Sequence, residues 1–443
     1  MYNPFNKELK DIQEDDLQIL LNVSEGWYIE YKSELPKARD IAKSIASFSN
    51  SRGGLYILGI KGNKTNNCAE EILGIEANQD IIHDAVRGNV MPFPYFECYS
   101  VPLRNNKKVM IVAVDEGQET PYIHNDGKIY RRQESSSDPI PENNRFSIDE
   151  LYKKSKEYQE KLKQFRTIDY GSCKGEENWS YLIGYVNTKR FNKTIITDFH
   201  EPEFANKILN FFNQKINIEE NAKKLYGHIL LNNITIFPES MIIRNITNMN
   251  IAYNTMTIEL FKNGNMKFML PINISKPLDF SCGEQINQYC IKNNIYESIN
   301  IIKFVPLFDL ATSICAIFIK YFKFLELYNC FESFEILFEG DNIWRTCLVA
   351  DVDDYLDYIK KYSLPIVIKN NIIYPDKPYR IIFTKDDTKG HGFLDTIFSI
   401  MGLALSGFGM SIFEVVNLFC SESNKRLIMT AKTNGENYEV KGK

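Results

Sequence analysis

Two glutamates and a lysine lie close together in the segment SEGWYIEYKSE, and side chains of these types can bind a metal ion or a phosphate. The three residues are Glu25, Glu30 and Lys32. Carboxylate oxygens are good ligands for Mg²⁺ or Mn²⁺, and an ammonium group can neutralise a phosphate. The alternative is an exposed strand face covered by salt bridges, which is the commoner use of charged side chains.

The spacing of these residues predicts how a strand would present them. Side chains alternate along WYIEYK, so Glu30 and Lys32 are expected on one face of a β-strand. Glu25 precedes Glu30 by five residues, which puts it on the opposite face of a regular strand. A bend or bulge at Gly26 is therefore needed to bring the two carboxylates together.

The elements that must position this segment are predicted along the first 165 residues. The segment Ala38–Asn50 has apolar residues at helical spacing, and SRGG followed by LYILGI predicts a glycine turn that leads into a buried strand. Further strands are expected at Phe96–Pro102, Lys108–Val114 and Lys128–Arg132, and a charged helix within residues 141–165. This mixture of elements predicts an α+β fold.

At 443 residues the chain is too long for one ordinary core, so two or three domains are expected. The predicted organisation is a first domain at residues 1–140, a helical connector at 141–168 and a larger mixed α/β region at 169–443. In this last region helices alternate with the strand-like runs SYLIGYV, KTIITDF, HILLNNITIF, TMTIELF and MKFMLPI. The apolar stretch Val305–Tyr328 is interrupted by charged residues and is predicted to be a buried helix.

Four successive blocks of the first domain carry a resemblance to a known family. The blocks are SEGWYIEYKSE, IASFSNSRGGLYILGI, DEGQETPY and GKIYRRQESSSDP. In this order they resemble the Schlafen-type, divergent Alba-like (AlbA_2) domain, in which an E-x4-E-x-K segment precedes a helix, a Gly-Gly turn and a buried strand. The resemblance covers residues 20–140 approximately, and it implies a Schlafen/Alba-like sheet-and-helix module followed by a region of unrecognised fold.

The resemblance implies a metal-dependent endoribonuclease that acts on tRNA or other structured RNA, as a microbial defence or stress effector. Glu25 and Glu30 match the carboxylates that hold a Mg²⁺ or Mn²⁺ ion beside the scissile phosphate, and Lys32 completes the catalytic set. Residues 169–443 would then sense an unknown trigger or partner.

The sequence departs from the family pattern just after the glycine-led strand. Lys61 stands where active members carry a third carboxylate, and a cation in this place weakens a metal site. Acids that could substitute for it are Glu70, Glu71, Asp80 and Asp84. The alternative function is therefore a catalytically inactive nucleic-acid-binding or regulatory protein that senses a ligand or partner through its C-terminal region.

The formal net charge is -5, so nucleic-acid binding has to be local. Residues 1–140 hold 16 Lys and Arg against 21 Asp and Glu. The basic residues expected to contact nucleic acid are Lys61, Arg104, Lys107, Lys108, Lys128, Arg131 and Arg132. Vertebrate members of the family that the chain resembles pair two such lobes into one groove, whereas the motif blocks occur once here, so a homo-oligomer is expected.

Other features argue against zinc, ATP and membrane partners. The nine cysteines form no CxxC pair, which disfavours structural zinc and indicates reduced thiols in a cytoplasmic protein. The N-terminal segment lacks a secretory signal. Thr396–Phe413 is long enough to suggest a transmembrane helix, but its glycines favour a buried helical hairpin or a close-packed helix. Gly59–Thr65 is one residue short of a P-loop, so ATP binding is not expected.

Overall fold

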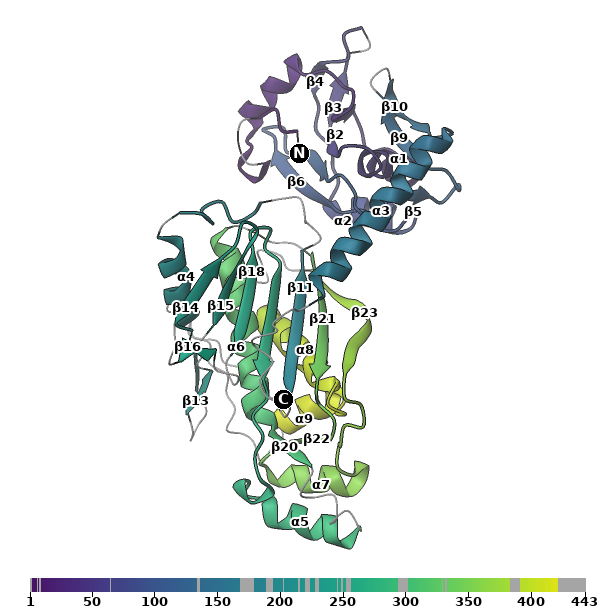
Figure 1. The fold of residues 1–443 in the computed structure, drawn as a ribbon. Helices are drawn as coiled ribbons and strands as arrows, with labels where there is room; N and C mark the ends of the chain where they lie inside the picture. Colours follow the sequence, from purple (N-terminus) through teal and green to yellow (C-terminus); the bar gives the residue numbers. More distant parts are fainter. Residues whose placement is uncertain are drawn as a thin grey trace. The chain divides into compact units, whose positions relative to one another are not determined.

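The computed structural model describes the chain except for residues 1, 6, 8, 64, 134–135, 168–178, 189–193, 202, 214–215, 220–223, 228–230, 245, 248–249, 252–255, 294–301, 329, 331–332, 383–390 and 421–443 (Figure 1). The chain divides into two compact units, Met1–Ile168 and Asp169–Lys443. Both contain helices and strands, so the predicted α+β class is confirmed.

The first unit is built around a four-stranded sheet. Its order is β1 (Ile29–Lys32), β2 (Gly54–Leu58), β7 (Lys108–Val114) and β6 (Phe96–Pro102). β1 and β2 are parallel, and the other pairs are antiparallel. Three of these strands and helix α1 (Ala38–Ser49) lie within one or two residues of the ranges predicted from the sequence, because alternation and helical spacing are strong there.

Both faces of this sheet are covered, which explains why its central strands read as continuous apolar runs. The helices α1 and α2 (Gln79–Arg87) pack on the face that includes Leu58 and Val112. The 3₁₀ helix η2 (Glu14–Asn22) packs with Ile57 and Ile111 on the other face. Each Å² of buried apolar surface contributes about 25 cal/mol to stability, so these two clusters are the main stabilising term of the unit.

Short elements complete the first unit. They are η1 (Leu9–Asp11), the hairpin of β3 (Ile60–Gly62) with β4 (Ala69–Ile72), the pair β5 (Val90–Met91) with β8 (Ile123–His124), and the pair β9 (Tyr130–Gln133) with β10 (Ser136–Pro141).

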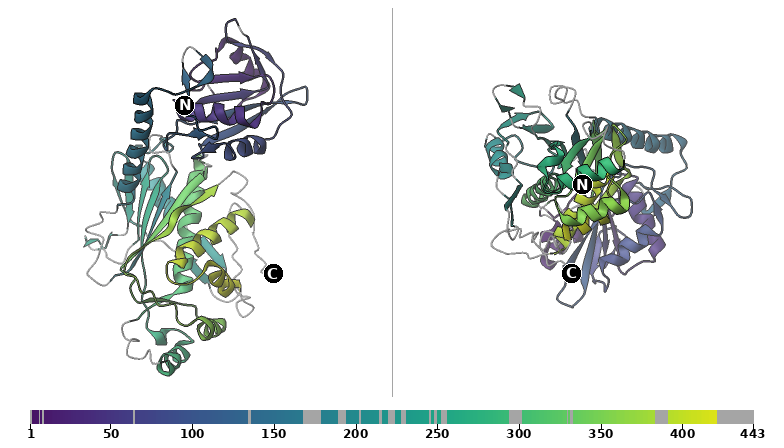
Figure 2. Two further views of the ribbon diagram at one scale, coloured as in Figure 1. Left: turned by 90° about the vertical axis from the view of Figure 1, so that its right-hand side faces the viewer. Right: turned by 90° about the horizontal axis from the view of Figure 1, so that it is seen from below.

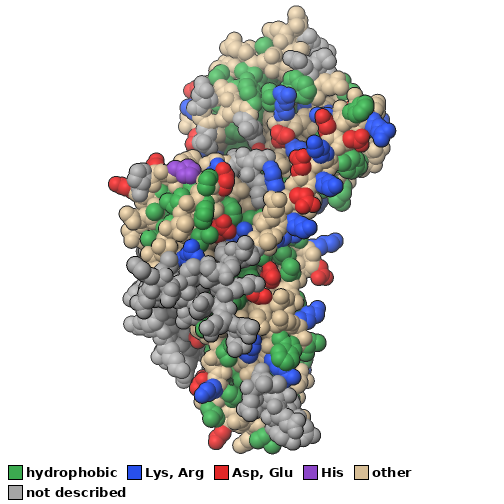
Figure 3. All heavy atoms as spheres, viewed as in Figure 1, with side chains coloured by type: hydrophobic (Ala, Val, Ile, Leu, Met, Phe, Trp, Pro, Cys, Tyr) green, Lys and Arg blue, Asp and Glu red, His purple; other side chains and the backbone are tan. Residues whose placement is uncertain are grey.

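The charged helix predicted after residue 141 is α3 (Arg145–Phe165), and it belongs to the first unit. The hydroxyl of Thr120 donates to the carbonyl oxygen of Leu151 over 2.6 Å, which fixes the helix to the preceding loop. Its exposed side carries acidic and basic side chains side by side (Figure 3).

The second unit contains a seven-stranded antiparallel sheet. Its order is β14 (Asn233–Ile236), β15 (Ser240–Arg244), β18 (Thr257–Phe261), β19 (Met266–Pro271), β11 (Tyr181–Asn187), β21 (Ser333–Asp341) and β23 (Ile372–Ile382). Four of the five predicted strand-like runs overlap strands of this sheet. KTIITDF does not: the amides of Ile195 and Ile196 both donate to the carbonyl of Lys262, and a turn follows, so no ladder forms in residues 194–199.

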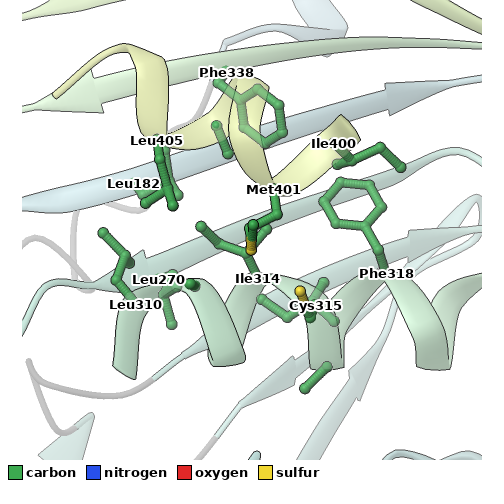
Figure 4. Close-up of a cluster of buried hydrophobic side chains, with 14 of the residues drawn as sticks. Leu182, Leu270, Leu310, Ile314, Cys315, Phe318, Phe338, Ile400, Met401 and Leu405 are labelled. Atoms are coloured by element: carbon green, nitrogen blue, oxygen red, sulfur yellow. The ribbon is translucent and has the colours of Figure 1, made fainter. Parts of the chain in front are cut away.

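Helices α6 (Leu307–Leu327) and α8 (His391–Ser406) cover one face of this sheet. Ile314 and Phe318 of α6 meet Met401 of α8 and Phe338 of β21 in the buried cluster of Figure 4. In the side view of Figure 2, α8 and α9 (Ile412–Cys420) lie on one side of the strands. The helix predicted at Val305–Tyr328 is thus confirmed as a buried one.

The predicted helical hairpin at Thr396–Phe413 is present as parts of α8 and α9, separated by a turn. Among the described residues, none of the helices is both long and apolar enough to cross a membrane. Smaller elements of this unit are α4 (Phe204–Asn213), β12 (Ile216–Glu219), β13 (Lys224–Gly227), β16 (Ile246–Thr247), β17 (Asn250–Ile251), η3 (Pro277–Asp279), α5 (Gly283–Lys292), β20 (Lys303–Pro306), β22 (Thr346–Val349) and α7 (Asp353–Tyr362).

Candidate functional site

Glu30 is the centre of a buried charge cluster on β1. Its side chain is 1% exposed. One carboxylate oxygen lies 3.0 Å from the Lys32 ammonium and accepts a 2.9 Å hydrogen bond from the Ser44 hydroxyl. The other lies 2.6 Å from a guanidinium nitrogen of Arg132. Glu30 and Lys32 therefore share a strand face as predicted, and the Glu30 carboxylate is buried rather than part of an exposed face covered by salt bridges.

Arg132 is the second buried member of this cluster, and its side chain is fully shielded from solvent. Besides Glu30, its guanidinium binds the carbonyl oxygen of Gly26 over 2.6 Å and lies 4.6 Å from the centre of the Phe48 ring. Its backbone amide donates to the Ser51 hydroxyl over 2.9 Å. Arg132 thus joins three of the four sequence blocks, and its buried side chain is not exposed to a ligand such as nucleic acid.

Glu25 reaches the same region through a turn that precedes β1. The amide of Gly26 donates to the carbonyl of Ile29 over 3.0 Å, so the chain bends where the sequence required it. A carboxylate oxygen of Glu25 then accepts a 2.6 Å hydrogen bond from the amide of Tyr31. Burial raises the pKa of Glu25, and the bond from Tyr31 offsets only part of this effect.

Lys32 is the member of the cluster that solvent reaches, with 31% of its side chain exposed. Burial acts to lower the pKa of Lys32, but attraction to Glu30 and Asp138 outweighs it, so the pKa lies above its ordinary value. The Asp138 carboxylate is 3.6 Å from the ammonium and is itself well exposed. Lys32 remains protonated at neutral pH and can meet an anionic ligand.

Lys61 does not face the two glutamates. Its side chain is half exposed, and its ammonium pairs with Glu70 over 3.0 Å. The position of β3 that faces the site is the next residue, Gly62, where an added Cβ would lie 3.7 Å from a carboxylate oxygen of Glu25. A third acid would therefore have to stand at residue 62 to face Glu25.

The donor set does not fit a catalytic divalent ion as it stands. Mg²⁺ and Mn²⁺ take about six oxygen ligands, and both oxygens of Glu30 are already bound by cations or a hydroxyl. Within the described part of the chain, no three His, Cys, Asp or Glu side chains are grouped so as to hold a metal. Of the acids considered as substitutes, Glu70 pairs with Lys61 and Asp84 with Arg87.

The other predicted basic residues fall into two groups. At the β6–β7 turn, Arg104 pairs with Asp15 over 2.9 Å, and Lys107 and Lys108 line an open depression. On the strand that carries Arg132, Arg131 points outward, is 25% exposed and lies 3.4 Å from Glu142. Lys128 is exposed in the turn before this strand. The structure places these residues but does not test whether they bind nucleic acid.

Sequence reasoning missed the hydroxyl groups around Glu30. Ser44 comes from α1 and Ser51 from the loop before the Gly-Gly turn. Tyr56 stands opposite Glu30 in the β1–β2 ladder, and burial raises the pKa of its phenol strongly. The sequence indicated these hydroxyl groups in part. A helix that carries Ser44, Ser47 and Ser49 next to an apolar strand needs buried polar partners.

Comparisons with known proteins bear on the first unit. Residues 25–141 match the model of the family described as Schlafen, AlbA_2. No curated protein is significantly similar to the chain.

Two solved structures are also similar to it. The solution structure of the N-terminal domain of a RecG-related protein from Nitrosomonas europaea is 19% identical with a TM-score of 0.22, and the match covers 30% of this chain and 92% of that one. The crystal structure of the DIP2311 protein from Corynebacterium diphtheriae is 12% identical with a TM-score of 0.23, covering 55% of this chain and 75% of that one. TM-scores this low support no argument about fold or function.

The matched segment begins at Glu25 and ends at Pro141, the last residue of β10. It contains the four sequence blocks except for Ser24, and every member of the buried charge cluster. The family has nucleic-acid-related functions. Residues 25–141 are thus a Schlafen, AlbA_2 domain, as the sequence blocks predicted.

Proposed function

We propose that the first unit binds nucleic acid, with structured RNA such as tRNA as the expected ligand, and that its carboxylate pair does not work as a metal-dependent nuclease in this chain. The observation that carries the proposal is the saturation of Glu30 by Arg132, Lys32 and Ser44. A metal ion at Glu30 would have to displace a buried cation. Removing one partner from a buried ion pair costs about 3–5 kcal/mol.

The two acids and two cations of the cluster balance, and the exposed Asp138 carboxylate lies 3.6 Å from Lys32, so a phosphate would displace Asp138 to reach this ammonium. The carboxylates of Glu25 and Glu30 lie beside the cations of Lys32 and Arg132, so the acids that would repel a phosphate are largely offset. Lys32 is the cation that solvent reaches. It is therefore the proposed phosphate contact.

Replacing Lys32 with alanine tests this assignment. Binding of fluorescent tRNA should weaken, and the slope of log affinity against log salt should fall by about one, because one phosphate contact is lost. Lys163→Ala is the matched control, since Lys163 is an exposed lysine at the end of α3. Equal loss in both variants would show that Lys32 contributes only net charge.

A second candidate is the metal-dependent endoribonuclease that the family resemblance implied, with Mg²⁺ or Mn²⁺ at Glu25 and Glu30. The observation in its favour is the turn at Gly26, which brings the Glu25 carboxylate into the region of Glu30. A sensing role for residues 169–443 and a homo-oligomeric state stay predictions.

A further inference from the structure

Two aromatic residues lie between the two glutamates of the site, in the turn Glu25–Tyr28. The backbone of this turn is fixed by the charge cluster itself, because Arg132 binds the carbonyl oxygen of Gly26. On the other side of the turn, the carbonyl oxygen of Tyr28 accepts a 2.7 Å hydrogen bond from the amide of Leu55. The backbone that carries Trp27 and Tyr28 is therefore held by hydrogen bonds on both sides, one of them from Arg132 of the charge cluster.

The rings of this turn form one surface group with an arginine. The Arg52 guanidinium carbon lies 5.3 Å from the centre of the Trp27 ring, and a guanidinium nitrogen is 3.4 Å from the Tyr28 hydroxyl. The ring of Tyr2 stacks on that of Tyr28, with centroids 5.3 Å apart and planes inclined by 26°. We call Tyr2, Trp27, Tyr28 and Arg52 the aromatic platform.

Core packing does not account for this arrangement. Trp27 is a member of neither buried cluster of the first unit among the described residues, and Tyr28 only touches the edge of one. Tyr2 is 42% exposed and Arg52 is exposed. A surface group of this kind is suited to a flat, electron-rich ligand.

We propose that the aromatic platform stacks an unpaired nucleobase of the bound RNA. The inference rests on the proposed nucleic-acid binding and names the part of the substrate that the site selects. Every base offers a π-face to Trp and Tyr, and a guanidinium group adds a cation–π contact. Bases in a duplex have both faces covered, so loops and single strands are the class that fits.

The test uses a single-stranded RNA oligomer that carries 2-aminopurine, whose fluorescence falls when the base stacks on an aromatic ring. Wild-type protein should quench the probe, Trp27→Ala should bind roughly tenfold more weakly with little quenching, and Trp27→Phe should retain most of both. A fully paired duplex of the same sequence should bind equally to the wild type and to Trp27→Ala.

Trp344→Ala is the matched control. Trp344 is 47% exposed and has the Arg345 guanidinium 4.5 Å from its ring centre, but it lies in the second unit. Its replacement should change nothing. Equal weakening of single strand and duplex by Trp27→Ala, or no effect on either, would overturn the platform while leaving the proposed function intact. Absence of RNA binding by the wild type would instead reject both.

Discussion

Replacing Arg132 with methionine should destabilise the first unit strongly. The methionine keeps an apolar stem over Phe48 but leaves the Glu30 carboxylate buried without the guanidinium that lies 2.6 Å from it. The carbonyl of Gly26 also loses its 2.6 Å partner. Breaking one side of such a buried ion pair costs about 3–5 kcal/mol. For a unit of this size, the loss corresponds to a fall in melting temperature of roughly 10 °C.

The assay is urea unfolding of the full chain followed by far-ultraviolet circular dichroism, with Arg131→Met as control. Arg131 is the next residue along β9 but is partly exposed, and its pair with Glu142 should contribute less than about 1 kcal/mol. The double variant Glu30→Gln with Arg132→Met should lose clearly less than the two single losses added together. Additive losses, or an Arg132→Met effect as small as that of Arg131→Met, would refute the buried-pair account.

Two further predictions concern Glu25 and its neighbours. Gly62→Asp should raise Mn²⁺ affinity, measured by calorimetry, because its carboxylate would face Glu25, whereas Lys61→Asp should not, because residue 61 points toward Glu70. The reverse order would show that the third-acid position is wrongly assigned. The raised pKa of Glu25 means that the folded state holds this proton more tightly than the unfolded state. Stability from this proton is present below the ordinary glutamate pKa and is lost as pH rises through the folded value. The unfolding free energy of Glu25→Gln, measured in urea, should therefore rise relative to that of the wild type as pH rises above about 4.3. The same pH dependence in both proteins would contradict this.

Local pattern was enough to predict most of the first unit. The alternation of WYIEYK, the helical spacing of Ala38–Asn50 and the glycine turn each specify one element with little help from the rest of the chain. At Gly53, φ is 70° and an added Cβ would lie 2.6 Å from the carbonyl oxygen of Val114. Both the backbone angle and the lack of space therefore require glycine at this position.

The sequence could not reveal which charges are buried. Arg131 and Arg132 are identical in type and adjacent, yet one points to solvent and the other into the cluster around Glu30. Their difference depends on which face of β9 meets α1, a tertiary fact that no local spacing encodes. The same holds for Lys61 and Gly62, since only the pairing of β3 decides which of them faces Glu25.

The central claim is that the first unit binds RNA without needing a metal ion, and one measurement tests it most directly. Fluorescence anisotropy of labelled tRNA is recorded with wild-type protein in excess chelator and again in Mn²⁺, and the RNA is then examined for cleavage on a denaturing gel. The account predicts dissociation constants that agree within about twofold and intact RNA in both samples, since Lys32 rather than a bound ion meets the phosphate. Binding or cleavage that appears only with Mn²⁺ and disappears in Glu25→Gln would contradict it.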